Sequence, residues 1–117
     1  MSVANRQTTP PYSWGAGCTG WRLVDAPGLT VIEEEMPPGT AEIPHLHKVA
    51  TQVFYGLTGQ LTLTLAGQTW TLGPGDALRI PPGTAHEVRN PGSEAARFLV
   101  ISTPSTAEDR IAVPMLD

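Results

Sequence analysis

Hydrophobic residues along this chain tend to recur at every second position. The clearest example is residues 61–65, where leucine alternates with threonine. Shorter or less regular runs occur at 21–24, 29–36, 52–57, 69–72, 77–80, 86–88 and 95–102, and glycine or proline separates most of them. A period of two residues is typical of strands with one buried face. Since no helical period of useful length is present, the pattern predicts an all-β sandwich or barrel of about nine short strands.

Two parts of this pattern are less regular. Glycine-rich chain lies between Trp14 and Trp21, which predicts a loop close to other backbone. Three glutamates, Glu33 to Glu35, fall inside the 29–36 strand. Because successive strand residues point to opposite faces, the three carboxylates cannot converge on one site. We interpret them as a solvated strand edge or charged rim.

Composition narrows the class of protein. The 117 residues fit one domain (1–117), and 12 glycines with 12 prolines suit many tight turns. The net charge is −4 and the seven basic residues do not cluster, so no nucleic-acid partner is expected. A single cysteine excludes an intramolecular disulfide, and no apolar run approaches the ~20 residues of a membrane helix. Since the N-terminal residues are polar and resemble no secretory signal, we expect a cytoplasmic protein with no membrane partner.

All three histidines lie in one part of the chain. His45 and His47 follow Pro44, which disfavours a helix there. Residues i and i+2 of a strand point to the same face, so the two imidazoles are expected side by side. His86 follows the turn at 81–84 and supplies a third imidazole. Three neutral imidazoles suit a divalent transition metal (Fe, Ni, Zn, Mn, Co or Cu), and the alternative is that these histidines only pack or lie on the surface.

Gln52 opens the 52–57 strand, so its amide could approach the same space as a fourth ligand. Glutamine offers a neutral carbonyl oxygen and cannot serve as a base. Alternation places Phe54 and Gly56 on the same face, and we assign Phe54, Gly56 and Val88 to a substrate pocket. Gly56 leaves its face bare, which either makes room for a ligand or permits tight packing. Because ligation needs neutral imidazoles, metal affinity is expected to fall below about pH 6.

These residues fall in two runs that resemble the two signature motifs of the cupin family. The second motif is matched at every defined position, by Gly75, Pro81, Gly83, His86 and Asn90. The first is matched by Gly39, His45, His47 and Gly59, whereas Gln52 stands where the family usually has glutamate. The resemblance implies a double-stranded β-helix, or jelly-roll cupin barrel, with its core at 28–102. Outside that core we expect an extended N-terminal arm at 1–13, either frayed or crossing to a second subunit, and a C-terminal surface tail at 103–117.

The resemblance also implies a set of functions. Cupin dioxygenases use oxygen on chelating substrates, so a metal-dependent, dioxygenase-like enzyme acting on a small oxygenated or anionic molecule is the first interpretation. One alternative is a metal-dependent isomerase, lyase or decarboxylase. Another is a non-catalytic cupin that binds a metal or a small ligand, since one fold hosts many functions. Small single-barrel cupins commonly dimerise, so we expect a homodimer with the N-terminal strands in its interface.

Overall fold

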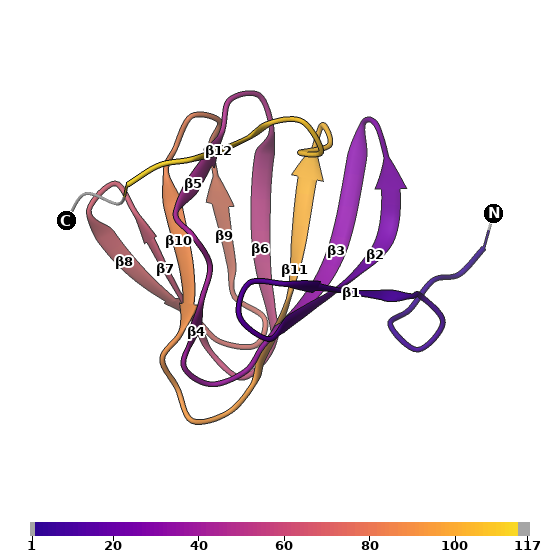
Figure 1. Cartoon of the computed structure of the whole chain (residues 1–117), viewed down its shortest axis with the longest axis horizontal. Helices are drawn as coiled ribbons and strands as arrows, with labels where there is room; N and C mark the ends of the chain where they lie inside the picture. The colour runs from indigo at the N-terminus through magenta and orange to yellow at the C-terminus, as the bar shows by residue number, and fades with distance from the viewer. Residues whose placement is uncertain (1, 115–117) are drawn as a thin grey trace.

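The computed structural model describes residues 2–114, which form twelve strands and no helix. The strands make two antiparallel sheets that face each other (Figure 1). The first sheet has the order β1 (Pro11–Trp14), β2 (Cys18–Ala26), β3 (Leu29–Met36), β11 (Ala96–Thr103), β6 (Thr51–Thr58) and β9 (Ala77–Ile80). The second has the order β12 (Arg110–Ala112), β5 (His45–His47), β10 (His86–Asn90), β7 (Leu61–Leu65) and β8 (Gln68–Leu72), and β4 (Thr40–Ala41) also pairs with β10.

The two sheets enclose the apolar core between them. Its fully buried side chains include Met36, Leu63, Val88 and Phe98, and the ring of Phe54 stacks on Phe98 with centroids 5.7 Å apart. Each large apolar side chain that is buried on folding stabilises the fold by about 1.5–3 kcal/mol. This arrangement confirms the predicted all-β jelly roll. None of the described residues belongs to a helix long and apolar enough to cross a membrane.

The N-terminal region differs from the prediction. Residues Pro11–Trp14 form β1 and pair with β2, in a register that sets Tyr12 opposite Gly20. The expected loop between Trp14 and Trp21 is therefore a tight hairpin turn, and Trp21 lies in β2. The arm predicted at 1–13 joins the first sheet from Pro11 onward, and residue 1 lies outside the described part of the chain.

The C-terminal region also differs from the prediction. After β11 the chain crosses one end of the sandwich and reaches β12, which pairs with β5 (Figure 1). The register sets Arg110 opposite His47 and Ala112 opposite His45. The tail predicted at 103–117 thus supplies a strand of the second sheet, because its backbone completes the edge of β5. Residues 115–117 lie outside the described part.

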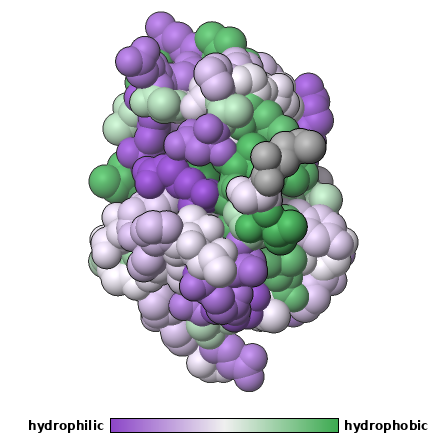
Figure 2. Space-filling view, turned by 90° about the vertical axis from the view of Figure 1, so that its right-hand side faces the viewer, coloured by the Kyte–Doolittle hydropathy of each residue, from purple (hydrophilic) through white to green (hydrophobic). Residues whose placement is uncertain are grey.

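The surface near the N-terminus mixes polar and apolar groups. Figure 2 looks onto that side of the molecule, where green apolar and purple hydrophilic areas adjoin. Large apolar side chains exposed in the first thirty residues are Val3, Val24 and Leu29. Such a surface would suit a homodimer formed through the N-terminal strands, which stays a prediction.

Candidate metal centre

Three imidazoles meet between the sheets. His45 and His47 project from the same face of β5, and His86 on β10 lies opposite His45 in the strand register. One ligand nitrogen from each ring lies within 4.8 Å of the other two, and the rings are almost fully buried. The turn before β10 is held against β5, because the N–H of Gly83 donates to the carbonyl of His47 at 2.6 Å. Gly83 has a φ of 76°, a conformation that glycine adopts without strain.

Hydrogen bonds fix the orientation of all three rings. The Nδ1 atoms of His45, His47 and His86 lie 2.9–3.0 Å from the backbone carbonyls of Ile43, Asp109 and Thr84, respectively. A carbonyl oxygen only accepts, so each Nδ1 carries the proton and each Nε2 keeps its lone pair. The Nε2 atoms of His47 and His86 are buried and have no hydrogen-bond partner among the described residues. Each of the three rings therefore offers an unprotonated Nε2 as a ligand to the same metal position.

Gln52 adds an oxygen from the facing sheet. Its Nε2 donates to the Ser102 hydroxyl at 3.0 Å, and Ser102 lies opposite it in the register of β6 and β11. This bond leaves Oε1 as the free end of the amide, buried and without a partner in the described chain. A buried oxygen without a partner is unfavourable unless a cation or donor satisfies it. The residues present therefore fit a divalent metal with nitrogen and oxygen donors.

Burial keeps the imidazoles neutral. Loss of hydration lowers the pKa of His45 to about 3 and that of His86 to about 4, although the bonds to Ile43 and Thr84 work in the opposite direction. The pKa of His47 is lowered by burial as well. A proton and a metal compete for the same lone pair, so neutral rings at physiological pH are ready to ligate.

Asp109 connects the C-terminal segment to this cluster. Its backbone carbonyl accepts the Nδ1 proton of His47, and its carboxylate accepts the N–H groups of Lys48, Val49 and Ala50 at 2.9–3.0 Å. The backbone bond from Ala50 is the main reason that the pKa of Asp109 is lowered. The sequence prediction missed this residue, because a three-residue strand in a mixed, proline-containing tail carries no visible period.

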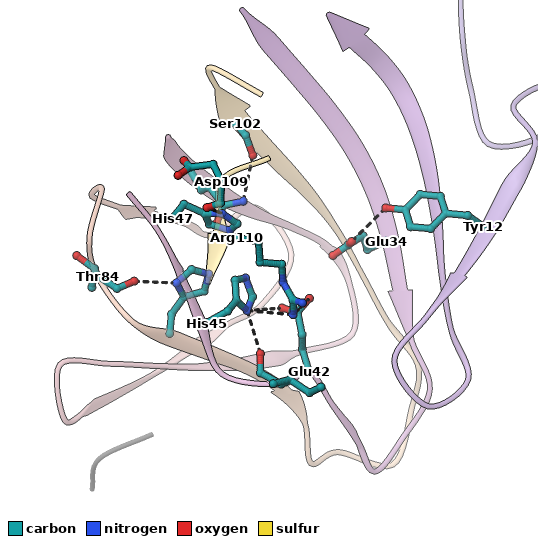
Figure 3. A network of polar contacts seen from close by, with 12 residues as sticks. Tyr12, Glu34, Glu42, His45, His47, Thr84, Ser102, Asp109 and Arg110 are labelled. Atoms are coloured by element: carbon teal, nitrogen blue, oxygen red, sulfur yellow. Dashed lines mark hydrogen bonds and ion pairs between the residues drawn. The ribbon is translucent and has the colours of Figure 1, made fainter. Parts of the chain in front are cut away.

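A second polar group lies beside His45. Glu42 Oε1 is 3.6 Å from His45 Nδ1, and a terminal guanidinium nitrogen of Arg110 is 3.8 Å from the other oxygen of Glu42 (Figure 3). Burial raises the pKa of Glu42 to about 7, and the charge of Arg110 acts against that rise. Glu42 therefore contacts the Nδ1 side of the His45 ring, whereas the metal-ligating nitrogen would be Nε2 on the other side.

A cavity of about 510 Å³ opens onto His45 and His47. Its lining includes the predicted Gln52 and Phe54, an apolar wall that Ile32 and Val100 extend, and five charged groups. These charged groups are Arg22, Asp25, Glu34, Glu42 and Arg110. A cavity of this volume is in the range of small-molecule sites.

Two residues assigned to the substrate pocket do not line this cavity. Val88 is fully buried in the apolar core between the sheets. A Cβ atom at Gly56 would collide with the carbonyl oxygen of Gly73, and Gly56 exchanges backbone hydrogen bonds with the 73–76 turn. The glycine therefore serves tight packing, the second of the two interpretations.

The glutamates of β3 also require a correction. Alternation separates them as expected, and Glu33 pairs with Arg6 at 3.3 Å and with Arg97 at 3.2 Å. Glu34 points the other way, into the cavity, so it belongs to neither a solvated edge nor a charged rim. No local signal marks it, since its hydrogen-bond partner Tyr12 is 22 positions away.

Comparison with known proteins agrees with this architecture. A family model described as a cupin domain matches residues 32–102. The chain belongs to the cupin family. This cupin is 41% identical over 59 residues to quercetin 2,3-dioxygenase of Bacillus subtilis, an alignment that covers 50% of this chain and 18% of that protein. It is 33% identical over 69 residues to polyketide synthase CurC of Streptomyces cyaneus, covering 59% of this chain and 45% of that protein.

A solved structure matches the whole cupin chain. The polyketide cyclase RemF of Streptomyces resistomycificus superposes with a TM-score of 0.86 and 25% identity, covering 100% of this chain and 88% of that one. By contrast, this cupin spans less than two thirds of the length of the two curated relatives named above. The family model and this superposition agree on the cupin fold.

Proposed function

We propose that this cupin is a metal-dependent enzyme acting on a small, oxygen-rich substrate. The observation that carries the proposal is the group of three buried imidazoles, His45, His47 and His86, beside a cavity that His45, His47 and Gln52 line, with Oε1 of Gln52 buried and without a partner in the described chain. A divalent metal held there would act as a Lewis acid toward a substrate oxygen. Its identity stays open among Fe, Ni, Zn, Mn, Co and Cu, because imidazole suits all of them.

The charge of the donor set supports an anionic or enolisable substrate. All four donors are neutral, since burial lowers the pKa of the histidines and Gln52 replaces a glutamate. The site would therefore keep the full positive charge of the metal, which favours enolate, phenolate or carboxylate oxygens. Arg110 at the cavity wall adds a positive charge, and Ile32, Phe54 and Val100 offer apolar contact to a carbon skeleton.

Two reaction types are supported by different relatives. Oxygenation is supported by the 41% identity to quercetin 2,3-dioxygenase, although that match covers half of the chain. Chemistry without oxygen, such as ring closure, isomerisation or decarboxylation, is supported by the likeness of the whole chain to the cyclase RemF. Quercetin and polyketides both carry the enol or phenol oxygens that a cationic site would attract.

Oxygen dependence tests this proposal. Metal-loaded protein is incubated with a flavonol and, separately, with an aromatic polyketide precursor, both in air and under argon. Oxygen uptake that matches substrate loss identifies a dioxygenase, and substrate loss under argon identifies the second type. Protein that binds metal and turns over neither substrate would favour the non-catalytic alternative, and protein that binds no metal would contradict the proposal.

A further inference from the structure

Three strands of the first sheet place a tyrosine against a glutamate inside the cavity. Tyr12 on β1 and Glu34 on β3 are both opposite Gly20 of the intervening β2. A Cβ atom at Gly20 would collide with the ring of Tyr12, so the missing side chain lets the phenol lie across β2. The phenol O–H then donates to Glu34 Oε2 at 3.5 Å. The guanidinium of Arg22 lies over the same ring, 3.9 Å from its centroid.

Glu34 occupies the wall of the cavity that holds the donor cluster. His45, His47 and Gln52 line the same cavity as Glu34, and Glu34 lies between Tyr12 and these two histidines in Figure 3. No described side chain forms an ion pair with it. Glu42 is a poorer candidate for contact with a substrate, because it pairs with Arg110 and stands on the Nδ1 side of His45. Gln52 cannot take a proton at all.

We propose that Glu34 is the catalytic base of this cavity, and that it removes a proton from carbon next to the carbonyl of an α-hydroxy-carbonyl or β-dicarbonyl substrate. This inference rests on the proposed metal-dependent function. In the step, the substrate C–H bond breaks and an O–H bond forms on the Glu34 carboxylate. The electron pair of the broken bond delocalises onto the carbonyl oxygen to give an enolate. Return of a proton from the carboxyl group to the same carbon regenerates the substrate. With an α-hydroxy-carbonyl substrate, the hydroxyl proton passes to the enolate oxygen, and protonation of the former carbonyl carbon then gives the isomer and restores the carboxylate.

The surroundings of Glu34 suit this task. Burial, followed by the negative charge of Glu42, raises the pKa of Glu34 to about 8, while the Tyr12 bond and the charge of Arg110 act in the opposite direction. The other titratable or charged groups of the neighbouring strands are Cys18, Arg22 and Asp25 of β2, of which Arg22 and Asp25 line the cavity, and Arg97 of β11, which pairs with Glu33. A base with a pKa near the working pH is an efficient proton acceptor. The ionised form is present above that pKa, so the rate is expected to rise with pH and level off above it.

Deuterium exchange tests the inference with defined probes. Zinc-loaded protein is mixed in D₂O with dihydroxyacetone or with ethyl acetoacetate, and proton NMR follows loss of the hydrogens beside the carbonyl. Zinc is chosen because it has no redox chemistry, so oxygenation does not contribute. Glu34→Gln is expected to slow exchange by about 100-fold, the usual contribution of a positioned base. Glu35→Gln removes the same charge from the neighbouring position, which does not line the cavity, and should exchange like the wild type.

Readouts that need no turnover accompany the exchange assay. Carbon-13 NMR of metal-free protein should show the Glu34 carboxyl titrating near pH 8, and Tyr12→Phe should move that titration to higher pH by removing a donor to the carboxylate. The exchange rate of Tyr12→Phe should shift along the pH axis in the same direction. Zinc affinity of Glu34→Gln should stay within about twofold of the wild type, because the residue is not a ligand.

The possible results separate the two proposals. Exchange that is fast with the wild type and slow with Glu34→Gln, at equal zinc occupancy, supports the role of Glu34. Equal exchange rates for the wild type and Glu34→Gln overturn it. A wild-type rate that is no higher than the rate with free zinc, for both probes, overturns it as well. Failure of the wild type to bind zinc would instead count against the metal-dependent function itself.

Discussion

Acid should release the metal only at a pH well below the usual pKa of histidine. At about pH 4.5, an imidazole with a pKa near 6.5 is free for ligation only ~1% of the time, so three such ligands would weaken binding by roughly 10⁶-fold. With a pKa of about 3 for His45 and about 4 for His86, competition by protons at these two rings weakens binding by less than ~2-fold. The pKa of His47 shifts in the same direction. The fall in affinity expected from the sequence near pH 6 therefore moves to lower pH.

Dialysis of zinc-loaded protein at a series of pH values, followed by elemental analysis, measures this release. Circular dichroism on the same samples shows whether the fold persists. Because the folded-state pKa values are depressed, the unfolded chain binds more protons from about pH 6.5 downward, and metal-free protein should lose stability over that range. Half-release near pH 6 from folded protein would mean that the rings are not buried as described. Zinc still bound by folded protein near pH 2 would mean that the histidines are not the ligands.

Further predictions concern Gln52, Asp109, Gly56 and assembly. If Gln52 ligates, Gln52→Glu should tighten zinc binding in calorimetry and Gln52→Leu should weaken it, whereas changes below about twofold in both would make it a bystander. Asp109→Ala keeps the carbonyl that binds His47 but removes the carboxylate that anchors this carbonyl to residues 48–50, so zinc binding should weaken by roughly 10- to 100-fold. Equal affinity of Asp109→Ala and the control Glu108→Ala would refute this. Gly56→Ala should lower the free energy of unfolding in urea by about 1–3 kcal/mol through overpacking against the 73–76 turn, unlike Gly28→Ala, where a Cβ meets open space. A homodimer should appear in sedimentation at micromolar concentration, and a monomer would contradict the predicted assembly.

The sequence predicted those site residues that lie a few positions apart along the chain. Two histidines separated by one residue share a strand face, and the turn at 81–84 ends close to the third. Alternation along β6 predicted Gln52 and Phe54 on one face, and both side chains line the cavity. The same alternation buries Gly56, but the 73–76 turn fills the space beside it, and no local pattern reveals a backbone contact between distant segments.

The parts that were missed depend on contacts between distant residues. Asp109 holds His47 across 62 positions, and the tail that carries it has no period of its own. Glu34 resembles a solvated acid when only its neighbours Glu33 and Glu35 are considered. Its place inside the cavity follows from the pairing of β3 with the N-terminal hairpin, which brings Tyr12 to it. The length and apolar alternation of β2 and β3 predicted strands there, but not which face of β3 the cavity would adjoin.

Calorimetric titration of metal-stripped, tag-free protein with zinc measures the metal centre itself. We expect one zinc per chain in the wild type and at least tenfold weaker binding, about 1.4 kcal/mol, in His86→Ala. His86 is the informative position because its ring is fully buried and its Nε2 has no partner in the described residues. Wild-type protein that takes up no zinc, or His86→Ala that binds it as tightly as the wild type, would contradict the metal centre.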